Sequence, residues 1–314
     1  MTLDRKQSPD FKGAPWHRFG TILNGVLTSG EGLRKAGLDW QLLKIKDPAN
    51  PGKCLLVAKD RNSHGADTVL GATRDTTAPF QNEEAFTLLD PLVENGLLAF
   101  DSMGYFRPRD GSFRIWAVCR VGGYVVMGKH DRVAKFVLFI HFPVSGYHRL
   151  SFLCLTLDEQ SVLIEEAPHN PQPLATTPRI RPRRFIDDTH NVIEKIDQHF
   201  ASLMRNYQEL IQVQLGPRAA MEYFANTCEV FNLEQEKMGR TKLSPEDRED
   251  RIRKCGLLFE SVEEPTLWNA YRCFVKVNDN LIKNEMKDDF LFEIWFSHLK
   301  GCALRVALRI ATGM

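Results

Sequence analysis

The sequence predicts an α+β fold, in which an N-terminal part with antiparallel β-hairpins and a helix is followed by an all-α C-terminal part. In the first half, apolar residues alternate with polar ones or form short continuous runs, as in β-strands. In the second half they recur every three or four residues, as on one side of a helix. A stretch with five prolines from Pro168 to Pro182 separates the two patterns, and proline excludes regular helix.

We therefore expect an α+β hairpin domain over 1–165, a Pro/Arg-rich linker over 166–186 and a helical region over 187–314, which could pack on the first as one unit. A chain of 314 residues can bury a substantial core. Its hydrophobic fraction of 43% and charged fraction of 26% are those of a soluble globular protein. The net charge of +1 gives no overall field that attracts a polyanion, so a nucleic-acid site would have to be a local patch.

The residues before the hairpins predict short elements in turn-rich sequence. A helix is expected over 30–37, and strands over 53–60 and 67–73. A longer helix follows in "QNEEAFTLLDPLVENG". Asn82 is its expected N-cap, and Asn95-Gly96 is the signal that ends it.

Two β-hairpins come next. The first pairs 99–106 with 112–121 through a turn at Asp110-Gly111, a dipeptide that favours tight hairpin turns. The second pairs 133–142 with 147–157, and its nearly continuous apolar arms are typical of strands covered on both faces. Because side chains alternate along a strand, one face of the arm 112–121 is apolar and the other carries Arg114, Trp116 and Arg120.

The helical region predicts five helices after the linker. They are expected over 187–215, over 218–232, from the cap Ser244-Pro245 onward, over 265–283 and over 288–311. The stripe from Ile193 to Leu210 in the first helix and the side of the fourth that bears Trp268 and Tyr271 are interpreted as core or subunit contacts.

The seven cysteines are scattered, odd in number and without a CxxC pair. This pattern is typical of buried thiols in a reducing compartment and not of a disulfide framework. No stretch of 18 apolar residues occurs, and the first residues, "MTLDRKQSPDFKG", contain no apolar signal region. We expect a cytoplasmic protein that does not enter a membrane.

Motifs of enzymes and cofactor sites are not found. The chain lacks a Walker loop, G-x-G-x-x-G and G-x-S-x-G, and "RVGGYVVMG" is interpreted as a turn rather than a phosphate cradle. The nine histidines form no HxH or HExxH pair, so no metal is expected. The sequence thus predicts a protein without enzymatic activity, cofactor or metal. An enzyme of unrecognised type, with a pocket around His141 and His148, stays a third possibility.

Several stretches resemble a known family. "APWHRFG", "AGLDW", "VLGATRDTTAPFQNEEAFTLLDPLVENG", "FDSMGYFRPRDGSFRIWAVCRV" and "TLWNAYRCFVKVND" are similar to the phage/plasmid-like protein family, a domain of unknown function (932) common in bacteriophage and plasmid genomes. The resemblance spans about 14–307 and is most specific over 69–121. It departs where relatives carry "HDGS" and "CQNTL", since this chain reads "PVSGYHR" and "LDEQSVL". It implies a divergent member from a mobile element, located in the bacterial host cytoplasm, and brings no activity with it.

Two groups of arginines are candidates for binding an anion. The first lies in the linker "PRIRPRRF", where an extended backbone could present guanidinium groups to successive phosphates: Arg179, Arg181, Arg183 and Arg184. The second lies on the first hairpin, where aromatic rings interleaved with arginines could stack on bases: Arg107, Arg109, Arg114, Trp116 and Arg120. For the linker, the alternatives are a solvated basic segment or arginines paired with acids such as Asp187 and Asp188. For the hairpin, the alternative is a core position for Trp116 against the helical half, with arginines that only keep the sheet soluble.

The opening "PWHRFG" has two interpretations. Trp16 is either an aromatic plug against the sheet or a residue that docks on a neighbouring subunit.

The hypothesis that best fits these observations is a non-enzymatic protein of a phage or plasmid that binds single-stranded DNA, possesses annealing-type recombination activity and forms homo-oligomers. It rests partly on an analogy with phage single-strand annealing recombinases, which also pair β-hairpins with a helix; such an analogy of fold does not fix function. The alternative is a protein-interaction or regulatory factor of a mobile element that acts on a host or phage partner.

Overall fold

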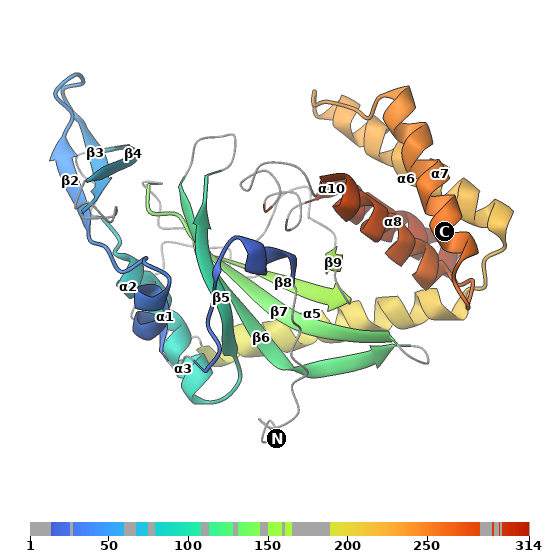
Figure 1. Cartoon of the computed structure of the whole chain (residues 1–314), viewed down its shortest axis with the longest axis horizontal. Helices are drawn as coiled ribbons and strands as arrows, with labels where there is room; N and C mark the ends of the chain where they lie inside the picture. Colours follow the sequence, from blue (N-terminus) through green and yellow to red (C-terminus); the bar gives the residue numbers. More distant parts are fainter. Residues whose placement is uncertain are drawn as a thin grey trace.

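A computed structural model of the chain describes residues 14–25, 28–59, 67–74, 79–107, 113–127, 131–144, 150–158, 161–164, 189–282, 291, 295 and 297–313. Antiparallel sheets fill its N-terminal half and helices its C-terminal half, which confirms the predicted α+β class. The central element is a six-stranded sheet of order β1-β5-β6-β7-β8-β9 (Figure 1). Its strands are β1 (Thr21–Ile22), β5 (Ala99–Phe106), β6 (Arg114–Met127), β7 (Asp131–His141), β8 (Leu150–Asp158) and β9 (Ser161–Ile164).

The two predicted hairpins are confirmed as the antiparallel pairs β5–β6 and β7–β8. They are also joined to each other, because β6 pairs with β7 as far as Met127 opposite Asp131. The interpretation of Gly122 and its neighbours as a turn is therefore wrong. The register shifts between Arg120 and Tyr124, and Gly122 has a φ of +64°, so the glycine supplies the positive φ of a bulge inside a long strand. Strand β9 is a further difference, since no strand was predicted between the second hairpin and the proline-rich linker.

Short helices cover the edge of the sheet near β5: α1 (Ser29–Lys35), α2 (Asn82–Phe86), η2 (Thr87–Leu89) and α3 (Asp90–Glu94) (Figure 1). The single helix expected after residue 82 is thus three consecutive short turns. Its predicted cap is corrected as well, because Gln81 forms the capping box with Glu84. Asn82 is buried, and its side-chain nitrogen donates to the Leu38 carbonyl at 2.8 Å, which satisfies that donor inside the fold.

A separate three-stranded sheet, β2 (Leu42–Lys46), β3 (Lys53–Ala58) and β4 (Thr68–Arg74), extends from one end of the molecule (Figure 1). Strand β2 was not predicted. One face of this sheet turns Leu42, Leu56 and Ala58 into the core. The other exposes Leu43, Ile45 and Val69.

The helices of the C-terminal half are α5 (Thr189–Gln212), α6 (Pro217–Lys237), α7 (Pro245–Glu260), α8 (Leu267–Ile282) and α10 (His298–Thr312). The predicted Ser244 cap is confirmed, since its hydroxyl accepts from the Asp247 amide at 3.0 Å. The last helix begins ten residues later than expected, behind the Ser297 cap; Leu291 and Trp295 before it are also helical. None of the described helices is both long and apolar enough to cross a membrane.

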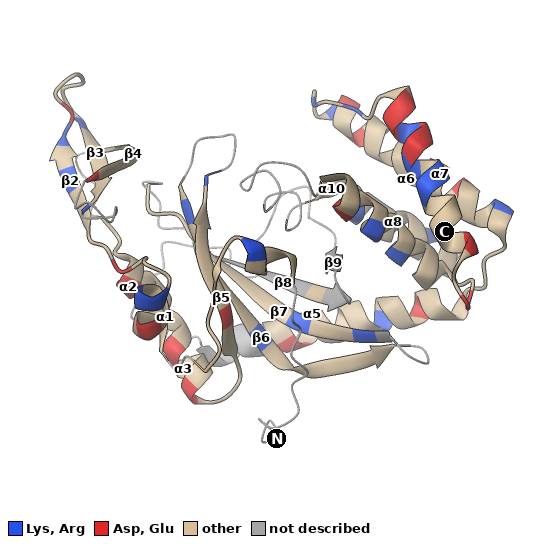
Figure 2. Cartoon of the chain, in the orientation of Figure 1, with Lys and Arg blue, Asp and Glu red and all other residues tan. Residues whose placement is uncertain are grey.

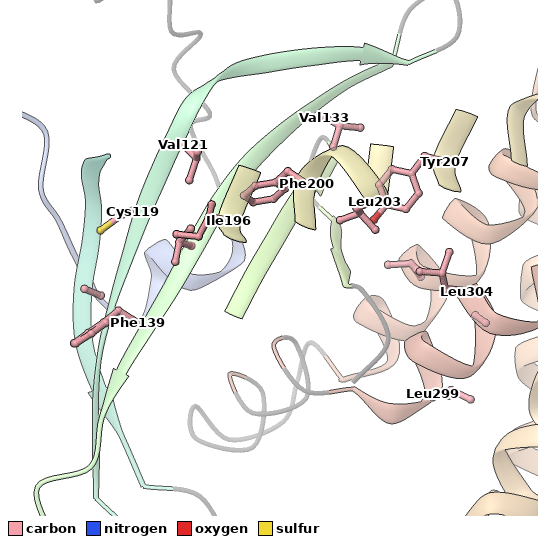
Figure 3. Close-up of a cluster of buried hydrophobic side chains, with 14 of the residues drawn as sticks. Cys119, Val121, Val133, Phe139, Ile196, Phe200, Leu203, Tyr207, Leu299 and Leu304 are labelled. Atoms are coloured by element: carbon pink, nitrogen blue, oxygen red, sulfur yellow. The ribbon is translucent and has the colours of Figure 1, made fainter. Parts of the chain in front are cut away.

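Apolar clusters cover both faces of the six-stranded sheet, as the continuous apolar strands predicted. We call the face that bears Ala117, Cys119 and Phe139 the back face. Helix α5 packs there through Ile196, Phe200, Leu203 and Tyr207 (Figure 3). Leu210 of α5 and residues of α8 and α10 complete the same cluster. The Tyr207 hydroxyl lies 3.0 Å from the Thr156 hydroxyl of β8. The stripe of α5 and the pair Trp268 and Tyr271 are therefore core, one of the two interpretations considered.

The opposite, front face has a smaller, aromatic-rich cluster. The 3₁₀ turn η1 (Pro15–Arg18) lies on this side, nearest the viewer in Figure 1. It inserts Trp16 against Phe136 of β7, with ring centroids 5.1 Å apart. Trp16 is fully buried, so its interpretation as a plug against the sheet is confirmed.

Candidate functional site

Trp116 occupies the centre of the front-face cluster. Its side chain is 0% exposed and lies edge-on to Trp295 at 5.1 Å, so the expectation of an exposed ring that stacks on bases is corrected to the core alternative. Two glycines leave room for the indole. A Cβ at Gly20 would lie 2.2 Å from the Trp116 ring, and one at Gly104 would lie 2.5 Å from it. Phe106 beside it is also fully buried.

The described arginines of the first hairpin all contact neighbouring groups. Arg107 is exposed, but its Nη2 donates to the Leu70 carbonyl of β4 at 3.3 Å and so ties the hairpin to the small sheet. The guanidinium of Arg114 lies over the rings of Phe106, at 5.5 Å, and Phe142, at 5.1 Å. Arg120 has its Nε 3.9 Å from the Asp101 carboxylate. Arg114, Trp116 and Arg120 do share one strand face, as predicted, but not an open basic surface.

Asp101 is the polar centre beneath this face. Its Oδ2 accepts from Trp16 Nε1 at 2.9 Å and lies 2.8 Å from His17 Nε2, which fastens the N-terminal turn to β5. Burial acts to raise the pKa of Asp101. The hydrogen bonds from His17 and Trp16, together with the charge of Arg120, outweigh burial and hold the pKa below its usual value. The carboxylate is therefore a positioning anion inside the fold.

The far end of the same face is open to solvent. Beyond the bulge, Tyr124 is 36% and Val126 56% exposed. The exposed Arg132 of β7 places its guanidinium 4.8 Å from the centroid of the Tyr124 ring. Near η1, exposed Arg18 lies 5.2 Å from the Phe19 ring. Arginine and lysine segments occur on η1 and along the long strands in Figure 2. Sequence analysis missed these pairs, although Tyr124 is visible as an aromatic residue after two glycines.

The remaining predicted site residues lie outside the described residues: Arg109, Arg179, Arg181, Arg183 and Arg184. His148 lies outside them too. Its proposed partner His141 is fully buried between the rings of Phe80 and Phe86, at 5.5 and 6.3 Å. The buried, aromatic surroundings of His141 therefore do not support a catalytic pocket around this residue.

A second polar cluster lies between α6 and α10. Glu234 Oε2 is 2.8 Å from His298 Nε2 and 2.5 Å from Arg305 Nη2. The Cys302 thiol donates to the same oxygen at 3.4 Å, and Arg305 Nη2 approaches the sulfur at 3.1 Å. Sequence analysis missed this cluster. The spacing of four between His298 and Cys302 is visible in the sequence, whereas Glu234 belongs to a distant helix.

The six cysteines that the structure describes are free and buried, as the scattered pattern indicated. Burial raises the pKa of Cys228 and of Cys273 to about 11, and it raises those of Cys119 and Cys255 further. Thiols with raised pKa values are poor nucleophiles at neutral pH. These four cysteines are therefore part of the packing.

No known protein family, curated protein or solved structure matches the chain. The resemblance to the phage/plasmid-like family stays a prediction.

Proposed function

We propose that the protein is a non-enzymatic single-stranded DNA-binding protein of the annealing type, encoded by a phage or plasmid, and that the strand binds along the open part of the front face. The support is one observation: two arginine–aromatic pairs with exposed arginines, Arg18 with the partly buried Phe19 and Arg132 with the exposed Tyr124, border the same side of the central sheet. The proposed DNA-binding surface therefore lies further along β6 than the surface around Trp116 that the sequence predicted.

The two pairs combine the groups that a single strand requires. Guanidinium groups neutralise phosphates, and an aromatic plane accepts a base by stacking, which contributes roughly 1–3 kcal/mol per base. Arg120 lies between the pairs, because it contacts Asp101, which also binds His17, the neighbour of Arg18 in the chain. A strand that follows this face would meet Arg132 and Tyr124 and then Arg18. The linker arginines would extend the track if they lie beside it.

The proposed location and assembly rest on the family resemblance. A mobile-element protein that anneals strands would act in the bacterial host cytoplasm and as a homo-oligomer, since annealing requires two strands to be held near each other.

The experiment is a titration of a fluorescein-labelled oligo(dT) at 50 and 200 mM salt, followed by anisotropy. We expect the double variant Y124A/R132A to bind at least about fivefold more weakly, since one stacked base is lost. The dependence of log affinity on log salt should flatten by about 0.7, the contribution of one phosphate contact on a single strand.

The matched control is R218A, which removes one charge from the highly exposed Arg218 of α6, on the helical half. Its affinity should equal that of the wild type. A second arm changes Arg179, Arg181, Arg183 and Arg184 to alanine. Loss of binding in that arm alone, with Y124A/R132A unaffected, would place the site on the linker and reject the front face. Absence of binding by the wild type at 50 mM salt would reject the function.

The small sheet supports a second candidate function, that of a protein-interaction factor. Leu43, Ile45 and Val69 are 39%, 50% and 51% exposed on one face, and they form an apolar surface that water does not favour. An identified host or phage partner that binds the wild type but not I45K/V69K would favour this function. It would do so only if the wild type also fails to bind the oligonucleotide.

A further inference from the structure

We propose that Glu234, His298 and Cys302 form a binding site for Zn²⁺ between α6 and α10. These are the only three His, Cys, Asp or Glu residues, among those that the structure describes, whose ligand atoms lie close enough to share a metal ion. A carboxylate, an imidazole and a thiolate are the three ligand types that zinc takes from proteins. This proposal uses different residues from the proposed DNA surface, so the two can fail independently.

Two of the ligands come from one helix. His298 and Cys302 lie one turn apart on α10, and residues four apart point from the same side of a helix. Glu234 approaches from α6. The two helices are held together beside the cluster by the Tyr223 hydroxyl of α6, which donates to the Ala303 carbonyl of α10 at 3.0 Å. Helix packing therefore presents the three groups to one point.

The separations suit a tetrahedral ion. All three ligand atoms lie within 4.8 Å of one another, and the carboxylate oxygen is 3.4 Å from the sulfur and 2.8 Å from the imidazole nitrogen. Zinc bonds of about 2.0–2.3 Å at tetrahedral angles place ligand atoms about 3.5 Å apart. Only small side-chain shifts are needed. The Glu234 and His298 side chains are each 17% exposed, which leaves an entry path for the ion.

Arg305 is the competing feature of the cluster. It donates to both Glu234 and Cys302, and on its own this would make the cluster an ionic network. Groups that donate to ligating side chains are common around metal sites, where they orient the ligands. Zn²⁺ would bind the Glu234 carboxylate and neutralise the charge with which Arg305 pairs. We therefore expect a moderate affinity for Zn²⁺. The Cys302 thiol loses its proton to solvent when it binds the ion, so the affinity should rise with pH.

Three protein ligands leave a fourth position for water, the arrangement typical of open zinc sites. Bound zinc would also link the last described helix to α6 and so stabilise the helical half. A purely ionic network would instead depend on Arg305 and respond to no metal.

The test is a titration of the reduced full-length protein with Co²⁺, which reports a thiolate ligand through a charge-transfer band in the near ultraviolet, followed by displacement with Zn²⁺. We expect the wild type to show the band and to lose it on addition of Zn²⁺. C302S should lack the band, and H298Q should bind at least about tenfold more weakly. E236Q, an exposed acid on the same helix, is the matched control and should behave as the wild type.

The variant R305Q distinguishes a zinc site from a purely ionic network. A zinc site predicts that R305Q keeps the cobalt band, and that Zn²⁺ raises the melting temperature of the wild type, E236Q and R305Q but not of H298Q. Circular dichroism establishes that each variant is folded. Absence of the band in the wild type, its persistence in both C302S and H298Q, or its loss in folded R305Q would overturn the proposal.

Discussion

The two ends of the front face of β6 have opposite environments. Trp116 and Tyr124 are both aromatic, both lie on the front face of one strand and both have an arginine nearby. Trp116 is 0% exposed, covered by the N-terminal turn and by Trp295, whereas Tyr124 is 36% exposed beside Arg132. The exposed fractions differ because other segments of the described structure pack over Trp116 and not over Tyr124. The alternation of residues along the strand does not predict this difference.

This comparison shows how an aromatic residue near arginines should be interpreted. At the covered end, the arginines pack on aromatic rings or pair with Asp101, and they complete a core. At the open end, the same combination of groups remains available to a ligand. Whether such residues form a functional surface therefore depends on whether other segments bury them, as much as on which residues are present.

The largest expected effect is on folding stability at the covered end. W116A should lower the free energy of unfolding by about 3–5 kcal/mol, because it leaves a cavity in a closed aromatic cluster. Y124A is the matched change at the open end and should lower it by less than about 1 kcal/mol. Urea denaturation followed by circular dichroism measures both. Equal losses in the two variants would mean that Trp116 contributes no more to the core than Tyr124 does.

A smaller effect is expected from added volume. G104A places a methyl group 2.5 Å from the Trp116 ring and should cost about 1–3 kcal/mol through overpacking. G123A lies in the same sheet, with open space around the added carbon among the described residues, and provides the control. The same urea titration applies. Wild-type stability in G104A would mean that the indole has room to move.

The third effect depends on pH. The pKa of Asp101 is lower in the folded protein than in the unfolded chain, so its stabilisation is complete above the unfolded value of about 3.9 and is lost as the pH falls through the lower folded value. D101N should cost about 1–3 kcal/mol at pH 7, since hydrogen bonds to a charged group are lost. The difference between wild type and D101N should shrink as the pH falls below about 4. A difference that grows as the pH falls below about 4 would contradict the assigned direction.

Local pattern predicted much of the fold. Alternation along β6 correctly assigned Arg114, Trp116 and Arg120 to one face. The predicted stripe from Ile193 to Leu210 marks the buried side of α5 over its described members, from Ile196 onward. Caps that depend on tertiary contacts were less predictable. Asn82 is a good cap by propensity, yet it is buried and bonded to Leu38, a residue far away along the chain.

The candidate sites were harder to predict because their parts come from distant segments. The sequence contains Trp16, His17 and Asp101 but does not indicate that they meet. Gly20 and Gly104 gave no sign that they make room for the same indole. His298 and Cys302 are spaced as ligands on a helix, but the third group, Glu234, is brought to them only by the packing of α6 on α10.

The origin of the front-face cluster constrains the order in which the chain acquires its structure during synthesis. The strands from β5 to β8 are neighbours in sequence and can pair soon after they leave the ribosome. The cluster above them joins Trp16, near one end of the chain, to Trp295, near the other. Contacts between such distant segments form late. Until Trp295 has been synthesised, Trp116 lacks part of its cover, and the nascent protein is exposed to aggregation at this face.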